Sequence, residues 1–244
     1  MSSDIVTFLH LEKLLSSRVV VVKEINKCDS GFVMSSVLGH CIKNKIPVIA
    51  VLTHNSLQHF HNVGLKMNYN LQRNIEAGLI QCIDLGEHCI THLLTNNTLP
   101  PLFDKIQESI NSMTEKYGKV SVIVDGVSHL FDLNYSLKEI NAFCKDIIES
   151  ISAYHSFVVF HCNEADEHDA THVLANLLAH QAHTILETRN LTSGWSTDVS
   201  GHLTIKQPGQ KFDDEHLYAI DVKPSQYLFK LFDRGVKLFA PGTV

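Results

Sequence analysis

The sequence predicts an α/β fold of three layers, in which helices cover both faces of a doubly wound, mostly parallel sheet and C-terminal antiparallel hairpins complete it. Short apolar runs alternate with amphipathic helical patterns over the first three quarters of the chain. Alternation of this kind favours right-handed strand–helix–strand crossovers. Several apolar runs are continuous, as in strands covered on both faces. The last quarter instead carries turn signals between apolar stretches, which indicate hairpins.

Six apolar runs are the candidate strands of the parallel sheet. The first contains four consecutive valines, and the others are rich in Val, Ile and Leu. Their lengths and continuous apolar character are typical of strands buried between two helical layers. The runs are residues 19–22, 47–52, 79–84, 120–124, 157–160 and 184–187.

Helical patterns with recognisable ends lie between these runs. Asp29 and Ser30 are predicted to begin a helix that carries Val33, Val37 and Cys41 on one face. A further helix is expected over residues 173–178, before the strand at residue 184, because its apolar positions repeat at helical spacing.

Two longer helices are predicted in the middle of the chain. Pro101 precedes a one-face apolar spacing over residues 103–117, and Gly118 follows as a stop signal. Ser136 and Glu139 match the S-x-x-E capping box, and an apolar stripe over residues 140–151 lies behind them. The acidic residues Asp166, Glu167 and Asp169 are expected to cap the N-terminus of the helix that follows them.

The last quarter is predicted to form antiparallel hairpins at one edge of the sheet. A turn is expected at Ser200 and Gly201, inside residues 195–205, and another at residues 233–235, between the stretches 227–232 and 236–240. Alternation puts apolar side chains on both faces of the stretch 227–232, and an edge of that kind must be covered. An intrachain helix and a partner subunit are the two alternatives for the cover.

Length and composition favour a single domain over residues 1–244. The chain is 44% hydrophobic and 19% charged, so a packed core is expected, and its formal net charge is −6. An acidic balance argues against a protein that grips nucleic acid alone, because neutralising phosphates needs clustered Lys and Arg. A basic strip could still lie on one face within the acidic total.

The cysteine spacing and the N-terminal residues indicate a soluble intracellular protein. No two of the six cysteines form a C-x-x-C pair, which argues against a zinc ribbon or a thioredoxin motif. No signal-peptide pattern precedes the first strand, and no run reaches the roughly 18 apolar residues of a membrane span. We therefore expect reduced thiols, no membrane association, and a location in the cytoplasm, with the nucleus as a second location to consider.

The loop after the first strand stands where a nucleotide-binding protein would hold phosphates. The phosphate loop G-x-x-x-x-G-K-[ST] uses its Lys and hydroxyl on the β/γ-phosphates and Mg²⁺. With the second Gly placed on Gly31, Asn26 replaces the first Gly, Phe32 the Lys and Val33 the Ser/Thr. Without the glycine freedom, the ammonium and the hydroxyl, the loop makes a poor anion site. It is predicted to be a degenerate phosphate loop that binds no nucleotide cofactor.

Asp125 ends the apolar strand at residues 120–124, where nucleotide hydrolases hold Mg²⁺ through an acidic residue. Acidic residues also end strands for turn chemistry. Because the first loop lacks the Lys and the Ser/Thr, Asp125 is interpreted as a vestigial counterpart of that metal-holding acid.

Other catalytic patterns are incomplete. His161, His168 and His172 lie near acidic residues and could build a zinc or iron site, but H-E-x-x-H is absent, and 16 histidines produce such groupings by chance. Neither the G-x-S-x-G elbow nor the Rossmann G-x-G-x-x-G is present. Lys43, Lys45, Lys206 and Lys211 are scattered and are interpreted as a solvated surface. No catalytic residue and no metal ligand is therefore predicted.

The second half of the chain resembles the Elongator complex protein 6 family. The matching segments keep a common order and spacing over roughly 85 residues. They are residues 157–161, 164–169, 177–183, 191–195, 198–203 and 237–242. The N-terminal half agrees in layout more than in residues.

The resemblance implies a RecA-like fold without a working Walker A motif and a non-catalytic role. Family members four, five and six alternate around a hetero-hexameric ring that binds tRNA, docks on the catalytic Elongator subunits and supports modification of wobble uridine (U34). Elongator complex proteins 4 and 5 are therefore the expected partners. The acidic net charge suggests that tRNA contacts come from loops at the ring face or from the sibling subunits.

Two other functions remain open from the sequence. The strand–helix order and Asp125 allow an active nucleotide hydrolase with a non-standard loop. The histidines at 161, 168 and 172 allow a metal-dependent enzyme. Nucleotide binding would distinguish the first alternative from an architectural subunit, and metal content would distinguish the second.

Overall fold

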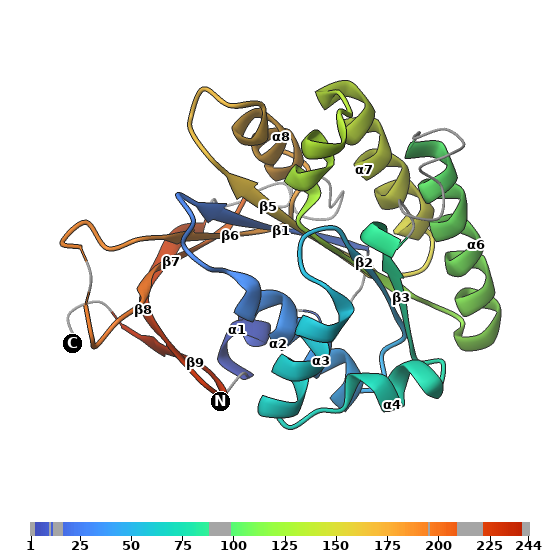
Figure 1. The fold of residues 1–244 in the computed structure, drawn as a ribbon, viewed down its shortest axis with the longest axis horizontal. Helices are drawn as coiled ribbons and strands as arrows, with labels where there is room; N and C mark the ends of the chain where they lie inside the picture. The colour runs from blue at the N-terminus through green and yellow to red at the C-terminus, as the bar shows by residue number, and fades with distance from the viewer. Residues whose placement is uncertain are drawn as a thin grey trace.

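Nine strands form one sheet within the part of the chain that the computed structural model describes, which is residues 3–9, 11, 17–87, 99–194, 196–208 and 222–240. Their order across the sheet is β3-β2-β4-β5-β1-β6-β7-β8-β9 (Figure 1). Strands β1 to β6 are parallel, whereas β7, β8 and β9 are added in antiparallel fashion. The bounds are β1 Arg18–Ile25, β2 Val48–Leu52, β3 Ile80–Asp84, β4 Ser121–Asp125, β5 Phe157–Glu164, β6 Thr184–Arg189, β7 Gly201–Gln207, β8 Val222–Phe232 and β9 Gly235–Phe239.

All six predicted strands are present, and three of them, β1, β5 and β6, are longer than predicted. β1 and β5 continue past their apolar runs because the two strands stay paired in parallel register as far as Ile25 and Glu164. The extensions carry polar side chains, among them Glu24 and His161, near the carboxyl end of the sheet. Backbone pairing thus holds charged residues on strand positions that composition alone would assign to a loop.

Helices cover both faces of the parallel part of the sheet (Figure 1). On one face lie α1 (Ser3–Leu9), α2 (Gly31–Lys43), α3 (Leu57–Lys66) and α4 (Leu71–Glu76), and on the other lie α6 (Leu99–Tyr117), the 3₁₀-helix η1 (Val127–Leu133), α7 (Leu137–Ser152) and α8 (Ala170–Ala179). The chain leaves β1 through α2 towards β2, and it leaves β5 through α8 towards β6 on the opposite side of β1. The predicted α/β architecture with a mostly parallel sheet between two helical layers is confirmed. None of the described helices combines the length and apolar character needed to cross a bilayer.

The four valines of β1 show how the sheet serves two cores. Val19 and Val21 join the apolar cluster under α6, α7 and α8, whereas Val20 and Val22 join the cluster under α1 and α2. All four are at most 4% exposed. Because successive strand side chains point to opposite faces, a continuous apolar run is the pattern that a doubly covered strand requires.

The predicted helix ends are confirmed where the side chains are described. The backbone N–H of Ser136 donates to Glu139 Oε2 at 2.8 Å, and the N–H of Glu139 donates to Ser136 Oγ at 3.4 Å, which completes the capping box of α7. Asp169 caps α8 by accepting from the N–H of Thr171 at 2.8 Å. Gly118 follows the last residue of α6 with a φ of 78°, a left-handed conformation that suits glycine.

One of the two predicted C-terminal turns is wrong. β8 and β9 form the expected hairpin about residues 233–235, but Gly201 is the first residue of β7 and pairs with Phe229 of β8 instead of forming a turn. A Cβ at Gly201 would lie 2.7 Å from the Arg189 carbonyl oxygen and 2.9 Å from both Cys28 Sγ and the Phe229 ring. The glycine is therefore required by close packing between strands. Trp195 and residues 241–242, which belong to the segments that carry the family resemblance, lie outside the described residues, as does Lys211.

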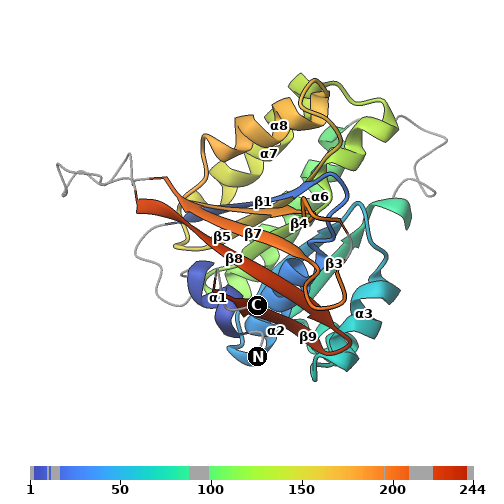
Figure 2. The same ribbon diagram turned by 90° about the vertical axis from the view of Figure 1, so that its left-hand side faces the viewer.

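Helices α1 and α2 of the same chain cover one face of the C-terminal strands. Tyr227 and Phe229 point inward, where the Tyr227 ring lies 5.2 Å from that of Phe8 in α1 and the Phe229 ring lies 5.0 Å from that of Phe32 in α2. The intrachain alternative is thus correct for this face. The opposite face of β7, β8 and β9 is turned towards the viewer in Figure 2, and none of the described helices crosses it.

Candidate functional site

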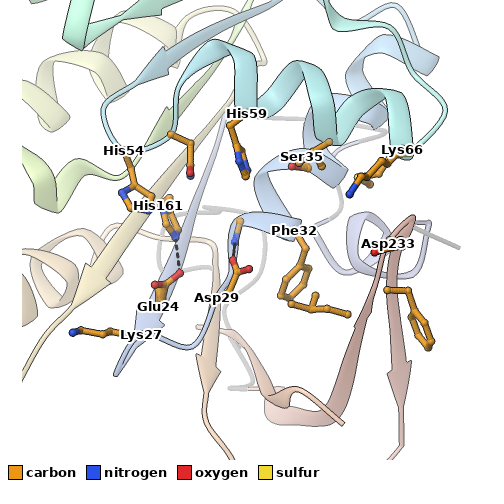
Figure 3. Close-up of a pocket in the computed structure, with 17 residues that line it drawn as sticks. Glu24, Lys27, Asp29, Phe32, Ser35, His54, His59, Lys66, His161 and Asp233 are labelled. Atoms are coloured by element: carbon orange, nitrogen blue, oxygen red, sulfur yellow. Dashed lines mark hydrogen bonds and ion pairs between the residues drawn. The ribbon is translucent and has the colours of Figure 1, made fainter. Parts of the chain in front are cut away.

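A cavity of about 510 Å³ opens at the carboxyl ends of the parallel strands (Figure 3). α2, α3 and the tip of the β8–β9 hairpin surround it, and the ends of β1 and β5 form its floor. This position lies beside the point where the chain connections diverge to the two sides of β1. In open α/β sheets, ligands bind in the crevice at such a switch point.

The loop from β1 to α2 borders this cavity and is held rigidly. Asn26 and Lys27 have φ values of 54° and 59°. Both residues therefore adopt the left-handed conformation, although neither is a glycine. The carbonyl of Asn26 accepts from Asn190 Nδ2 at 2.8 Å, and the carbonyl of Cys28 accepts from Thr188 Oγ1 at 2.8 Å. The loop is therefore fastened to the end of β6 and the residue that follows it.

The first backbone N–H groups of α2 already have acceptors inside the chain. Glu24 Oε2 accepts from the N–H and from Oγ of Ser30, both at 3.0 Å. Asp29 Oδ1 accepts from the N–H of Gly31 at 2.9 Å. A helix N-terminus favours an anion through its free N–H groups and its dipole. Here the anion is supplied by Glu24 of the protein itself.

Phe32 and Val33, which replace the phosphate-loop Lys and Ser/Thr, make apolar contacts. Phe32 lines the cavity and packs against Phe229, and Val33 is fully buried among the side chains under α2. Gly31 lies at the first position of α2, as the comparison with the phosphate-loop pattern assumed. The structure thus brings Gly31 and Phe32 to the lining of the cavity and Val33 to the core below it, whereas Asn26 lies in the loop outside that lining.

Asp125 lies at the end of β4 and is entirely buried, with its carboxylate committed to protein groups. Its Oδ2 accepts from the N–H of Asn55 at 2.9 Å and from Asn55 Nδ2 at 3.2 Å. Its Oδ1 lies 3.4 Å from His161 Nδ1. Thr53 Oγ1 donates to the Asp125 carbonyl oxygen and completes the connection between the ends of β2 and β4.

His161 joins the carboxylates of Glu24 and Asp125 in one buried cluster, which we call the acid–histidine cluster. His161 Nε2 lies 3.6 Å from Glu24 Oε2 (Figure 3). The same nitrogen lies 2.7 Å from Ser30 Oγ. The three side chains come from β1, β4 and β5, and all point to the face that α2 covers, because strand positions alternate. Sequence patterns alone did not predict this cluster, although Lys23 and Glu24, which directly follow the valine run of β1, were a signal for it.

Interactions within the acid–histidine cluster shift the pKa values of its three side chains. Burial alone would lower the pKa of His161, but hydrogen bonds and charge interactions with Asp125 and Glu24 raise it to about 9. Burial would raise the pKa of Glu24, yet its bonds to His161 and Ser30 lower it to about 2. The pKa of Asp125 is likewise lowered, because its hydrogen bonds outweigh burial. At neutral pH we therefore expect two carboxylates and one imidazolium, with Ser30 relaying a hydrogen bond from His161 to Glu24.

The stability of the protein is expected to fall as pH rises from 6.5 to 9. The folded-state pKa of His161 lies above its ordinary value of 6.5, so its contribution is complete below pH 6.5 and is lost as pH rises through about 9. The loss should be on the order of 2–3 kcal/mol. Urea unfolding of the unmodified chain and of His161→Gln across this range measures it. A slope that persists unchanged in His161→Gln would contradict the assignment.

The hypothesis of a metal site at His161, His168 and His172 is wrong in its geometry. His161 faces α2, whereas His172 lies on α8 across the sheet, where its Nδ1 is 2.9 Å from Glu164 Oε2. His168 is exposed. Among the residues that the structure describes, no group of three or more His, Cys, Asp or Glu side chains is arranged to hold a metal ion.

A second buried ion pair lies on the α8 face and was also missed. Lys23 Nζ is 3.1 Å from Glu164 Oε1 and donates to Asn176 Oδ1 at 2.6 Å. Both charged side chains are less than a tenth exposed. A buried ion pair needs such additional hydrogen bonds to offset the loss of water. The polar ends of β1 and β5 are thus fixed from both faces of the sheet.

Fold and site together define a class of protein. It is a three-layer α/β protein with a crevice at the switch point, and in that crevice the N–H groups at the start of α2 bind carboxylates of the chain itself. The match to known families is consistent with this class. The family model described as Elongation complex protein 6 matches residues 8–223, and the chain belongs to the Elongator complex protein 6 family.

Relatives from distant animals resemble the chain over most of its length. Elongator complex protein 6 of Drosophila melanogaster is 27% identical over 235 residues, which cover 92% of this chain and 91% of the fly protein. The protein of the same name from Homo sapiens is 25% identical over 242 residues, with 88% of each chain covered. That from Danio rerio is 21% identical over 239 residues, which cover 89% of this chain and 88% of the fish protein.

Proposed function

We propose that this chain is a non-catalytic, structural subunit of the Elongator complex. The whole of residues 1–244 is then one RecA-like domain with a degenerate phosphate loop. It lies beside Elongator complex proteins 4 and 5 in a hetero-hexameric ring that binds tRNA, docks on the catalytic subunits and supports modification of wobble uridine U34. We assign it to the cytoplasm, with the nucleus as a second location. The family match and the names of the relatives support a place in this complex.

The carboxylate of Glu24 at the start of α2 is the observation that carries the non-catalytic part of the proposal. A triphosphate at this place would bring further negative charge beside Glu24 and Asp29, in a site where charges are poorly screened. Displacing Glu24 would remove its two bonds to Ser30 and leave the buried His161 with one carboxylate fewer. Both effects disfavour binding at the start of α2, where Phe32 replaces the phosphate-loop Lys; the lysines that line the cavity, Lys27 and Lys66, lie in the preceding loop and at the end of α3.

Assembly with the sibling subunits tests the structural role. Co-expression of this chain with Elongator complex proteins 4 and 5 is expected to yield one complex, whose mass by native mass spectrometry is that of a hetero-hexamer containing all three. Omitting either sibling should prevent the ring from closing, because each chain in an alternating ring presents two different contact faces. Purification of this chain as a lone monomer in the presence of both siblings would contradict the proposal.

An active nucleotide hydrolase is the second candidate, favoured by one observation: Asp125 ends β4 and lies 3.4 Å from His161, which lines the switch-point cavity. We expect titration calorimetry with Mg·ATP to show no saturable binding at about 1 mM nucleotide. Saturable binding together with turnover that Asp125→Asn abolishes would establish the hydrolase instead. A melting temperature of the folded Asp125→Asn chain provides the control for that variant.

A further inference from the structure

The three C-terminal strands present a face that lies away from α1 and α2, and we call it the outer face (Figure 2). Inward-pointing Phe229 is buried, and strand alternation therefore turns its neighbours outward. The pairing register extends this face from β8 to β9 and across β7 to the end of β6. Its cationic members are Arg189, Lys206, Lys230 and Lys237, and its phenylalanines are Phe232 and Phe239.

The outer face is basic in a chain whose formal net charge is −6. Its described strand residues include four cationic side chains and a single carboxylate, that of Glu187. Glu187 is already engaged, since its Oε1 lies 2.5 Å from Lys206 Nζ and its Oε2 lies 3.9 Å from Arg189. A local excess of positive charge of this kind attracts polyanions.

Lys230 and Lys237 lie directly opposite each other on β8 and β9. Like charges in opposed positions on neighbouring strands destabilise a sheet. Among the described residues, no carboxylate forms an ion pair with either lysine, and Lys230 Nζ donates only to the neutral carbonyl oxygen of Thr197, at 2.8 Å. An anion bound between the two ammonium groups would relieve this repulsion.

Aromatic rings stand beside both lysines. Phe232 is 52% exposed, unusually open for a large apolar side chain, and Phe239 is partly exposed. Lys230 Nζ is 5.5 Å from the Phe232 ring centre, and Lys237 Nζ is 5.0 Å from that of Phe239. Open aromatic rings on a sheet, flanked by cations, suit unpaired bases, which stack on the rings while their phosphates meet the cations. A duplex keeps its bases stacked inside and would leave the rings unused.

We propose that the outer face binds a single-stranded segment of RNA. Lys230 and Lys237 contact phosphates, and Phe232 and Phe239 stack on bases. The proposal rests on the proposed function for the identity of the RNA, which would be tRNA. It goes beyond that function by naming the surface through which this chain contacts the nucleic acid.

Fluorescence anisotropy of a labelled oligouridylate with the full chain tests the proposal. For Lys230→Gln/Lys237→Gln we expect an affinity loss of about tenfold at 0.1 M salt, and a salt slope reduced by about 1.4, since each neutralised phosphate contributes about 0.7. Phe232→Ser should weaken binding by about 5- to 100-fold. Lys138→Gln/Lys145→Gln, which removes two exposed cations of α7, is the matched control and should leave affinity unchanged. A deoxyuridylate of equal length distinguishes RNA from DNA.

The outcomes separate this proposal from the proposed function. Weaker RNA binding by the outer-face variants, with intact assembly beside Elongator complex proteins 4 and 5, supports both. Absence of RNA binding by the unmodified chain, or equal losses in the α7 control, overturns the outer-face proposal and leaves assembly as a separate question. If the outer-face variants lose the sibling subunits but keep their RNA affinity, the face is a protein interface and the RNA proposal is overturned.

Discussion

Replacing His161 with Gln is expected to lower the free energy of unfolding by about 3–5 kcal/mol, the usual cost of removing one partner from a buried charge group. His161 and Asp125 are at most 1% exposed, and the imidazolium lies between two carboxylates. Without it, Glu24 and Asp125 would face each other with no counter-charge. Chemical denaturation at pH 7 of the unmodified chain and the variant measures the loss.

A neutral version of the same cluster is the matched control. The triple variant Glu24→Gln/His161→Gln/Asp125→Asn removes both negative charges together with the positive one. It should therefore recover much of the stability that His161→Gln loses, because no buried charge is left unpaired. A single variant within about 0.5 kcal/mol of the unmodified chain would show that His161 is not the charged centre of the cluster.

Truncation of Phe229 to Ala is expected to destabilise the protein by about 3–5 kcal/mol, the range for a large aromatic side chain lost from a core. Phe229 is 1% exposed and touches Phe32 of α2, so it joins the antiparallel strands to the helical layer. Its ring also lies beside Gly201, which has no side chain that could refill the space. Thermal unfolding followed by circular dichroism gives the size of the effect.

Phe232 on the same strand supplies the comparison for this prediction. Phe232→Ala removes an identical ring from the opposite face, where half of the side chain is in solvent. Its stability should therefore stay within about 0.5 kcal/mol of that of the unmodified chain. Equal losses in the two variants would mean that α1 and α2 do not cover the inner face of β8 as described.

Apolar patterning predicted the strands well because burial on both faces forces continuous hydrophobic runs. The same patterning failed at the ends of β1 and β5, where Lys23, Glu24 and His161 occupy strand positions. Those residues remain in the sheet because their backbones pair and their charges find partners on other strands. Neither cause can be read from a local segment, since the partners Asp125 and Glu164 are more than 100 residues from β1.

Gly201 and the basic outer face are two further features that local sequence patterns did not predict. A serine–glycine pair is a turn signal in the sequence, yet the glycine serves a close contact between strands. Lys230 of β8 and Lys237 of β9 become direct neighbours only because the pairing register places them opposite each other. Register therefore decides which charges become neighbours.

Local sequence patterns were sufficient to predict the six parallel strands, the helices α2, α6, α7 and α8, and the absence of a phosphate-loop Lys, because each depends on residues close together in the chain. The arrangement of the strands in space was needed to show that Glu24 occupies the start of α2, that His161 joins it to Asp125, and that the outer face is basic. These features arise between strands distant in sequence, where burial and pairing set the distances between charges and so their energies.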